Sequence, residues 1–101
     1  YCPIPDFVVN GKHRATADPV IVRFQGDYYL FSTNQWGYWW SGDMFRWTFV
    51  PRKFLKPQHR VYDELCAPAA FVLDDALHVV GSTYTKDFPI WKSKNPRTDD
   101  W

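Results

Sequence analysis

The residues of this chain that could do chemistry are carboxyl groups and aromatic rings rather than histidines or cysteines. The three histidines, His13, His59 and His78, are far apart, and no two of them have the spacing of a metal site. The two cysteines, Cys2 and Cys66, are also distant from each other and make no metal-type pattern. We therefore predict no metal site in this chain, interpret the histidines as structural or solvated, and expect no disulfide between the cysteines.

Asp18 is the carboxyl group with the most distinctive position, because it precedes Pro19 and an apolar run. Proline restricts the residue before it, so Asp18 is expected to be extended. Asp-Pro is also common at a turn before a strand, so a purely structural role is a second interpretation. Asp63 and Glu64 lie between apolar segments, and we interpret both as solvated loop charges.

Composition narrows the class of protein. Aromatic residues make up 20% of the 101 residues, which favours a β-rich fold or a carbohydrate-facing surface. The net charge is +1 with acidic and basic residues interspersed, so neither nucleic acid nor an acidic membrane is expected as a partner. The chain also lacks the run of about 18 apolar residues that a membrane-spanning helix requires.

An internal repeat organises the chain. Residues 19–33 and 68–82 align without a gap at an offset of 49 residues. Each copy has an apolar run, a two-residue turn (Gln25-Gly26 or Asp74-Asp75) and a second apolar run. A turn-forming pair between two apolar runs is typical of a β-hairpin.

The repeat continues beyond the hairpins. Trp39-Trp40-Ser41 matches Trp91-Lys92-Ser93, and Trp47 matches Trp101. We predict seven strands, near 19–24, 27–32, 37–41 and 46–50 in the first unit and near 68–73, 76–82 and 89–93 in the second. The fourth strand of the second unit would be cut off at Trp101, and a helical turn is expected only near 62–66.

Four strands in a repeat of about 50 residues are typical of a β-propeller blade. The sequence therefore predicts an all-β fold with blade one at 17–66 and blade two at 67–101. The first strand of each blade would be innermost and buried on both faces, because 20–24 and 69–73 are nearly continuous apolar runs. Residues 1–16 form a lead-in segment and a possible closing strand. Two blades leave apolar faces uncovered, so we expect the chain to be an excerpt or one part of an assembly.

Several short motifs, in this order and at blade spacing, carry a resemblance to a known family. They are Ala17-Asp18-Pro19, the strand 26–32, Ser41-Gly42-Asp43 before Trp47, Cys66-Ala67-Pro68, and Asn95-Pro96 before Asp100-Trp101. Together they resemble the first two blades of glycoside hydrolase family 43. That resemblance implies a five-bladed propeller that hydrolyses arabinose- and xylose-containing glycans with inversion.

The resemblance assigns the role of general base to Asp18. It implies that the general acid, a Glu, and a tuning Asp lie beyond residue 101, so the chain alone should be inactive. It further implies a plant- or microbial-type glycan as substrate, the remaining blades as partners, and an extracellular or periplasmic location. No cofactor is expected in this chain, although the parent protein could hold a structural cation on the propeller axis.

Aromatic and polar residues in loops are candidates for sugar contacts. Trp36 is the best stacking candidate, with Asn34 and Gln35 as hydroxyl partners. Cys66 stands where the family often has a Trp, and Tyr62 could replace that ring. Further candidates from the second blade are Thr83, Tyr84 and Asp87. Trp47 and Trp101 are interpreted as blade-packing residues, and at least one of the adjacent Trp39 and Trp40 is expected in the core.

Three alternatives remain open. A lectin-like or degenerate propeller would bind sugar without cleaving it. A naturally short chain would assemble several copies into a propeller. A related five-bladed family would use the same Asp as a nucleophile with retention, which the separation of the two carboxyl groups distinguishes (about 6.5–9.5 Å for inversion, about 5–5.5 Å for retention).

Overall fold

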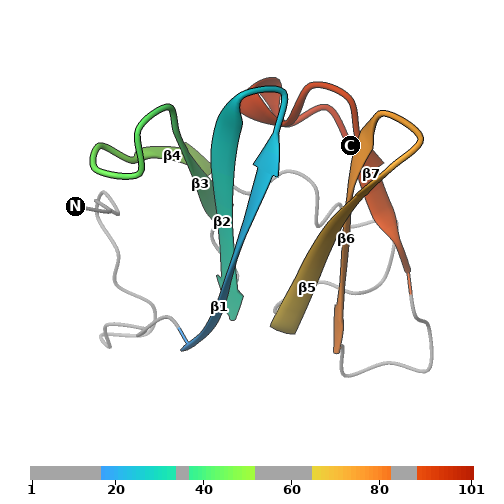
Figure 1. Ribbon diagram of the computed structural model, residues 1–101. Coiled ribbons are helices and arrows are strands. Elements are labelled where there is room, and N and C mark those ends of the chain that lie inside the picture. Colours follow the sequence, from blue (N-terminus) through green and yellow to red (C-terminus); the bar gives the residue numbers. More distant parts are fainter. Residues whose placement is uncertain (1–16, 34–36, 52–64, 83–88) are drawn as a thin grey trace.

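The computed structural model describes residues 17–33, 37–51, 65–82 and 89–101 (Figure 1). Strands dominate this part of the chain, which contains a single short 3₁₀ helix and no α-helix. The all-β prediction is therefore confirmed. None of the described helices is long and apolar enough to cross a bilayer.

The first sheet has four strands in the order in which they occur in the sequence, and each pairs antiparallel with the next. They are β1 (Ala17–Phe24), β2 (Asp27–Thr33), β3 (Gly37–Ser41) and β4 (Thr48–Pro51). These bounds lie within two residues of the predicted strands. The agreement arises because each segment is bounded by local turn residues that the sequence reveals directly.

The second sheet repeats this order with three strands, β5 (Cys66–Leu73), β6 (Ala76–Ser82) and β7 (Trp91–Ser93). After β7 the chain forms the 3₁₀ helix η2 (Pro96–Thr98) and one isolated bridge between Asn95 and Asp100, in the segment that matches the turn before Trp47 in the first repeat. Proline suits the first position of η2, where its missing N–H is not needed. The helical turn predicted near 62–66 is wrong at its last two positions, because Leu65 makes a β-bridge and Cys66 begins β5; residues 62–64 lie outside the described part.

Both hairpins use the predicted two-residue turns. Gln25 and Gly26 have φ values of +52° and +83°, and Asp74 and Asp75 have values of +50° and +57°. Two consecutive positive φ angles are the type I′ geometry, whose twist matches that of the flanking strands. Glycine adopts this geometry without strain, and Asp tolerates it better than most residues.

The first strand of each sheet carries the same irregularity. The register shifts between Ala17 and Val20 in β1, and between Cys66 and Ala69 in β5. At the centre of each shift the residue before proline has a positive φ, +49° at Asp18 and +46° at Ala67. The prediction of an extended Asp18 is therefore wrong, because the bulge turns the backbone at the position where proline alone would favour an extended residue.

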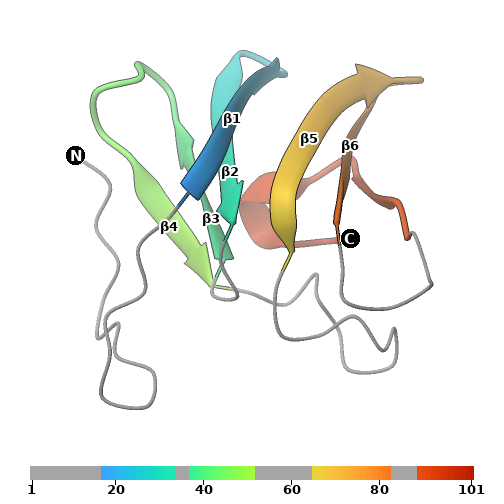
Figure 2. The same ribbon diagram turned by 90° about the horizontal axis from the view of Figure 1, so that it is seen from below.

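The two sheets lie side by side with their first strands, β1 and β5, as neighbours (Figures 1 and 2). The core fills the space between them, and its buried members are mostly aromatic or branched: Phe24, Tyr29, Phe31, Tyr38, Val50, Leu65, Leu77, Val79 and Trp91. Trp39 is also buried and packs against Phe49, 5.3 Å between ring centroids. The expectation that at least one of Trp39 and Trp40 belongs to the core is confirmed.

The prediction that both first strands are buried on both faces is wrong for these two sheets. Most residues of β1 and β5 are exposed or half-buried. One face of each strand packs toward the core, through Val20 and Val22 in β1 and Ala70 in β5, although Val72 on the same face as Ala70 is exposed. The expectation that two units leave apolar surface uncovered is confirmed by Ile21, Phe71 and Leu73, which are all exposed.

One buried hydroxyl joins the two sheets. Tyr38 in β3 is fully buried, and its Oη donates a hydrogen bond to the carbonyl oxygen of Pro96. The same oxygen accepts a hydrogen bond from Nε1 of Trp101 at 3.0 Å. The Trp101 ring meets the rings of Tyr38 and Phe31 edge-on, with centroids 5.7 and 6.0 Å apart. Burial raises the pKa of the Tyr38 phenol well above its usual range, so the group stays protonated and keeps its donor.

Arg97 forms a second contact between the sheets. Its Nε and Nη2 donate to the two carboxylate oxygens of Asp27, both at 2.7 Å. Its guanidinium carbon lies 3.9 Å from the centroid of the Trp40 ring. The hydrogen bond to Asp27 raises the pKa of the guanidinium further, so Arg97 remains charged. A planar guanidinium can pair with a carboxylate and stack on a ring at once, which an ammonium cannot.

The matching tryptophans differ in what they pack against. Trp101, from the end of the second repeat, packs against Phe31 and Tyr38 of the first sheet. Trp47 is buried, and its Nε1 donates to the carbonyl oxygen of Met44 at 3.1 Å. Asp43 shapes this turn: its Oδ1 accepts hydrogen bonds from the backbone of Phe45 and Arg46 at 2.8 and 2.9 Å. These bonds, that from Arg46 above all, hold the pKa of Asp43 below its usual range.

Replacing the Tyr38 hydroxyl tests the contact between the sheets. We expect Tyr38→Phe to lower the free energy of unfolding by about 1–3 kcal/mol, because it leaves the indole N–H of Trp101 and the carbonyl of Pro96 without this partner. Tyr28→Phe is the control. The Tyr28 ring is half-buried in β2, and its contact with the guanidinium of Arg23 uses the ring face and not the hydroxyl. Urea unfolding measures both variants, and equal effects would contradict the role given to Tyr38.

Gly37 tests a close approach of two strands. A Cβ at Gly37 would lie 2.0 Å from the carbonyl oxygen of Val50 in β4, so Gly37→Ala must push β3 and β4 apart. We expect a loss of about 3 kcal/mol or more. Gly26→Ala is the control, since only its φ of +83° is unfavourable and no atom lies within 4 Å, which limits the cost to about 1 kcal/mol. Thermal unfolding that ranks the two variants in the opposite order would contradict this packing.

Candidate functional site

Asp18 lies at the end of the first sheet where β1 begins and β2 ends. Its side chain is exposed, and the bulge in β1 sets its backbone at a φ of +49°. Ala17 is paired with Thr33, the last residue of β2, so the two strand ends are held together. Such a conformation is costly for a non-glycine residue and marks a position where the surroundings impose the geometry.

Thr33 holds the carboxyl group of Asp18 in place. The Thr33 hydroxyl donates to Oδ2 of Asp18 at 3.1 Å. Its oxygen also accepts the backbone N–H of Ala67 at 2.7 Å. A hydroxyl has one hydrogen to donate and two lone pairs, so the bond from Ala67 directs the Thr33 hydrogen toward Asp18. The position of the carboxyl group therefore depends on the second repeat.

Sequence reasoning did not identify Thr33 as a site residue. A signal was present, because Thr33 aligns with Ser82 in the repeat and both carry a hydroxyl. Its significance depends on a contact with Ala67, which is 34 residues away, and pattern analysis within one repeat does not reveal that contact.

The chemistry open to this site is that of an exposed carboxyl group with one fixed hydrogen bond. A carboxylate in this position can accept a proton from a water molecule. Inverting hydrolysis also requires a second carboxyl group to protonate the leaving oxygen. Within the described residues no group of three or more His, Cys, Asp or Glu side chains gathers in a way that could hold a metal ion.

The predicted sugar contacts fall in the segments that connect the described strands. They are Asn34, Gln35, Trp36, Tyr62, Thr83, Tyr84 and Asp87, and all of them lie outside the described residues. Asn34–Trp36 follow Thr33 directly in the sequence, and Thr83 follows Ser82. Cys66 is half-buried at the start of β5, and His78 is half-buried in β6.

A hollow adjoins the same end of the second sheet. It has a volume of about 440 Å³ and is lined mainly by small and apolar residues: Ala67, Ala69, Val80, Gly81, Ser82, Pro89 and Ile90. Ala67 and Ser82 are the repeat equivalents of Asp18 and Thr33. The second sheet thus has the same bulge, but Ala67 stands where the first sheet has Asp18. Of these two equivalent positions, only Asp18 carries a carboxyl group.

Comparison with protein-family models, with curated proteins and with solved structures gave no match for this chain.

Thr33 can be tested by removing its hydroxyl while keeping its shape. We expect Thr33→Val to lower the free energy of unfolding by about 1 kcal/mol, because the backbone N–H of Ala67 and the carboxyl group of Asp18 both lose their partner. Thr33→Ser retains the hydroxyl and should stay within about 0.5 kcal/mol of the unchanged chain. A double-mutant cycle with Asp18→Ala measures the coupling between the two side chains, and a coupling of zero would contradict the bond.

Proposed function

We propose that this chain is part of a β-propeller glycoside hydrolase similar to family 43, in which Asp18 is the general base. The observation that carries the proposal is the fixed carboxyl group at the start of β1, held by Thr33 and, through it, by the next repeat. In a propeller the ends of the first strands surround the central axis. A carboxyl group there faces the funnel in which a sugar would bind.

Two further features support the propeller part of the proposal. Each sheet is an antiparallel meander in sequence order, and the two sheets pack with their first strands adjacent. Radial packing of such four-stranded units around a channel defines a propeller. The exposed apolar residues of β1 and β5 are then the surfaces that further blades would cover.

The proposed mechanism gives Asp18 a single step. The carboxylate accepts a proton from a water molecule as that water attacks the anomeric carbon from the face opposite the leaving group. A second carboxyl group, from a blade outside this chain, protonates the leaving oxygen. Thr33 orients the carboxylate through Oδ2, and the remaining lone pairs of the carboxylate can accept the proton of the water.

The substrate class follows from the family resemblance and is an arabinose- or xylose-containing glycan. Such a polymer occurs outside the cytoplasm, which fits an extracellular or periplasmic location. The competing function is sugar binding without hydrolysis, which would require the same funnel but no general acid.

The test is turnover of aryl arabinofuranosides and xylosides by a propeller that contains this chain, together with the anomeric form of the first product seen by NMR. We expect inversion, and we expect Asp18→Ala to reduce turnover by about 10²–10⁴-fold. Azide can replace the attacking water, and as an anion it does not need a base to remove a proton. Added azide should therefore restore glycosyl transfer in Asp18→Ala and yield a glycosyl azide of inverted configuration.

Asp75→Asn is the matched control, because Asp75 is exposed in the β5–β6 turn and Asn also tolerates its positive φ. It should leave turnover unchanged. Retention of configuration would instead make Asp18 a nucleophile. Sugar binding without any turnover in the unaltered protein would favour the lectin-like alternative.

A further inference from the structure

The face of the second sheet that points away from the first sheet is open and apolar. Phe71, Leu73 and Ile90 are 40%, 53% and 62% exposed. Ala70, next to Phe71, packs toward the core, so Phe71 and Leu73 lie on the opposite face of β5. Two hollows, one at each end, indent this outer face.

The first sheet shows how such a face is covered. Its equivalent residues, at an offset of 49, are Phe24, Tyr29 and Phe31, which correspond to Leu73, His78 and Val80. All three are buried against the second sheet. The chain therefore contains one occupied and one open version of the same surface.

Besides the bonds of Tyr38 to Pro96 and Trp101, two polar contacts hold the second sheet on the first, one at each end. At one end the backbone N–H of Ala67 meets the Thr33 hydroxyl. At the other end Arg97 pairs with Asp27, stacks on Trp40 and contacts Tyr29. A cavity of about 370 Å³ surrounds this second contact, with Gln25, Asp27 and Tyr29 on the side of the first sheet.

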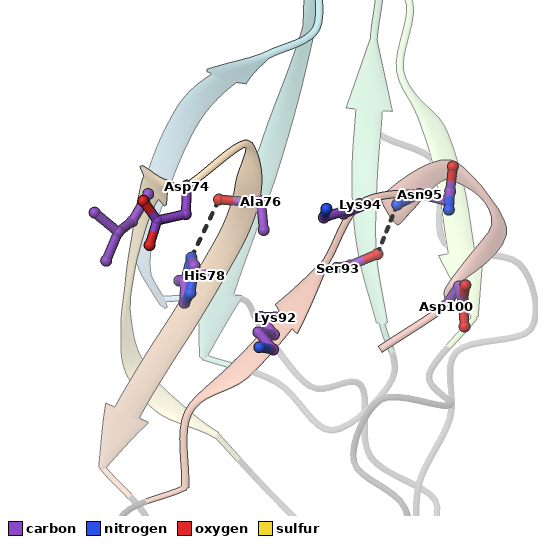
Figure 3. A pocket seen from close by; sticks show the side chains of 9 residues that line it. Asp74, Ala76, His78, Lys92, Ser93, Lys94, Asn95 and Asp100 are labelled. Atoms are coloured by element: carbon purple, nitrogen blue, oxygen red, sulfur yellow. Dashed lines mark hydrogen bonds between the residues drawn. The ribbon is translucent and has the colours of Figure 1, made fainter.

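The open face has a pocket at the equivalent place (Figure 3). Its volume is about 450 Å³, and Asp74, Ala76 and His78 line it. These three residues are the equivalents, 49 positions later, of Gln25, Asp27 and Tyr29. The pocket is thus the position in which the counterpart of Arg97 from a following sheet would lie.

The residues of this pocket differ from those that bind Arg97. Ala76 replaces Asp27, which removes the carboxylate, and Lys92 replaces Trp40, which removes the stacking ring and adds a positive charge. His78 replaces Tyr29; its Nδ1 lies 3.1 Å from the carbonyl oxygen of Ala76, so Nδ1 is the donor of that bond. Its ring stacks on Phe71 at 5.1 Å.

Other charged groups also line the pocket. Lys94 adds a second cation, and Asp74 and Asp100 lie toward opposite ends of it in Figure 3. The pocket as a whole is therefore mixed in charge. At the position that matches the guanidinium of Arg97, however, the carboxylate of Asp27 has become the methyl group of Ala76 and the neighbouring ring has become an ammonium group.

We propose that the outer face of β5, β6 and β7 binds a further antiparallel sheet of the same repeat, and that this sheet carries Asp or Glu at the position of Arg97. The carboxylate pairs with Lys92. At the other end, the Ser82 hydroxyl accepts the backbone N–H that opens the new sheet, as Thr33 does for Ala67. The proposal rests on the propeller part of the proposed function and not on hydrolysis.

The test extends the full chain with a second copy of residues 48–101 after Trp101. Trp47 and Trp101 are equivalent, so the added segment supplies an outer strand for the second sheet and then a third sheet. The added copy carries Arg97, Arg97→Gln or Arg97→Glu. We expect the urea midpoint to rise in the order Arg, Gln, Glu, with about 0.5–1 M between the two extremes.

A converted surface is the matched control. Ala76→Asp, His78→Tyr and Lys92→Trp in the first copy rebuild the three residues that contact Arg97 on the first sheet. The order of the three midpoints should then reverse, with Arg the most stable. Because the same three added side chains are compared on both surfaces, general effects of charge on the third sheet cancel.

Several results would overturn the proposal. These are equal midpoints, a preference for Arg on the unconverted surface, or failure of all three extended chains to fold. A midpoint that rises with protein concentration would mean that a second copy of the chain covers the face instead. None of these measurements involves turnover, so an inactive Asp18 would leave the result unchanged, and a failed docking would leave the hydrolysis test unchanged.

Discussion

The arrangement of the two sheets depends on the buried hydroxyl of Tyr38. This hydroxyl accepts a hydrogen bond from the indole N–H of Trp101 and donates one to the carbonyl oxygen of Pro96. These bonds attach the segment after β7 to β3 of the first sheet. Without these bonds three polar groups would be buried at a cost that the aromatic contacts around them must offset. The segment after β7 forms η2, and its residues Pro96 and Trp101 bond to Tyr38 of the first sheet.

The candidate site also depends on packing between the two sheets. Ala67 reaches Thr33 only when β5 lies against β1, and Thr33 in turn orients Asp18. The carboxyl group is thus fixed by packing between repeats rather than by its own strand. A site built in this way has a defined geometry only where neighbouring sheets are in place, which agrees with a role inside a closed ring of blades.

The sequence predicted the strands and hairpin turns well because these are local. Gln25-Gly26 and Asp74-Asp75 each determine a turn from two residues, and the apolar runs on either side define the strands. The sequence did not predict the positive φ of Asp18 or the exposure of β1 and β5. The first depends on a bulge that proline geometry alone does not reveal, and the second depends on which surfaces find a neighbour. Of the proposed site, the sequence suggested Asp18, whereas Thr33 was missed because its partner Ala67 lies in the other repeat.

Successive interfaces in a repeat protein can share one shape and still differ in chemistry. The two copies here keep the shape: the same turn geometry, the same bulge and the same hydroxyl at the end of the second strand. They change the polar contact from Asp27 and Trp40 to Ala76 and Lys92. Apolar residues such as Phe24 and Leu73 contribute area without distinguishing one neighbour from another, whereas a reversed charge disfavours the wrong one. In the proposed arrangement, the charge at this one position gives the second sheet a preferred neighbour, while the hydrophobic surface around it does not distinguish between neighbours.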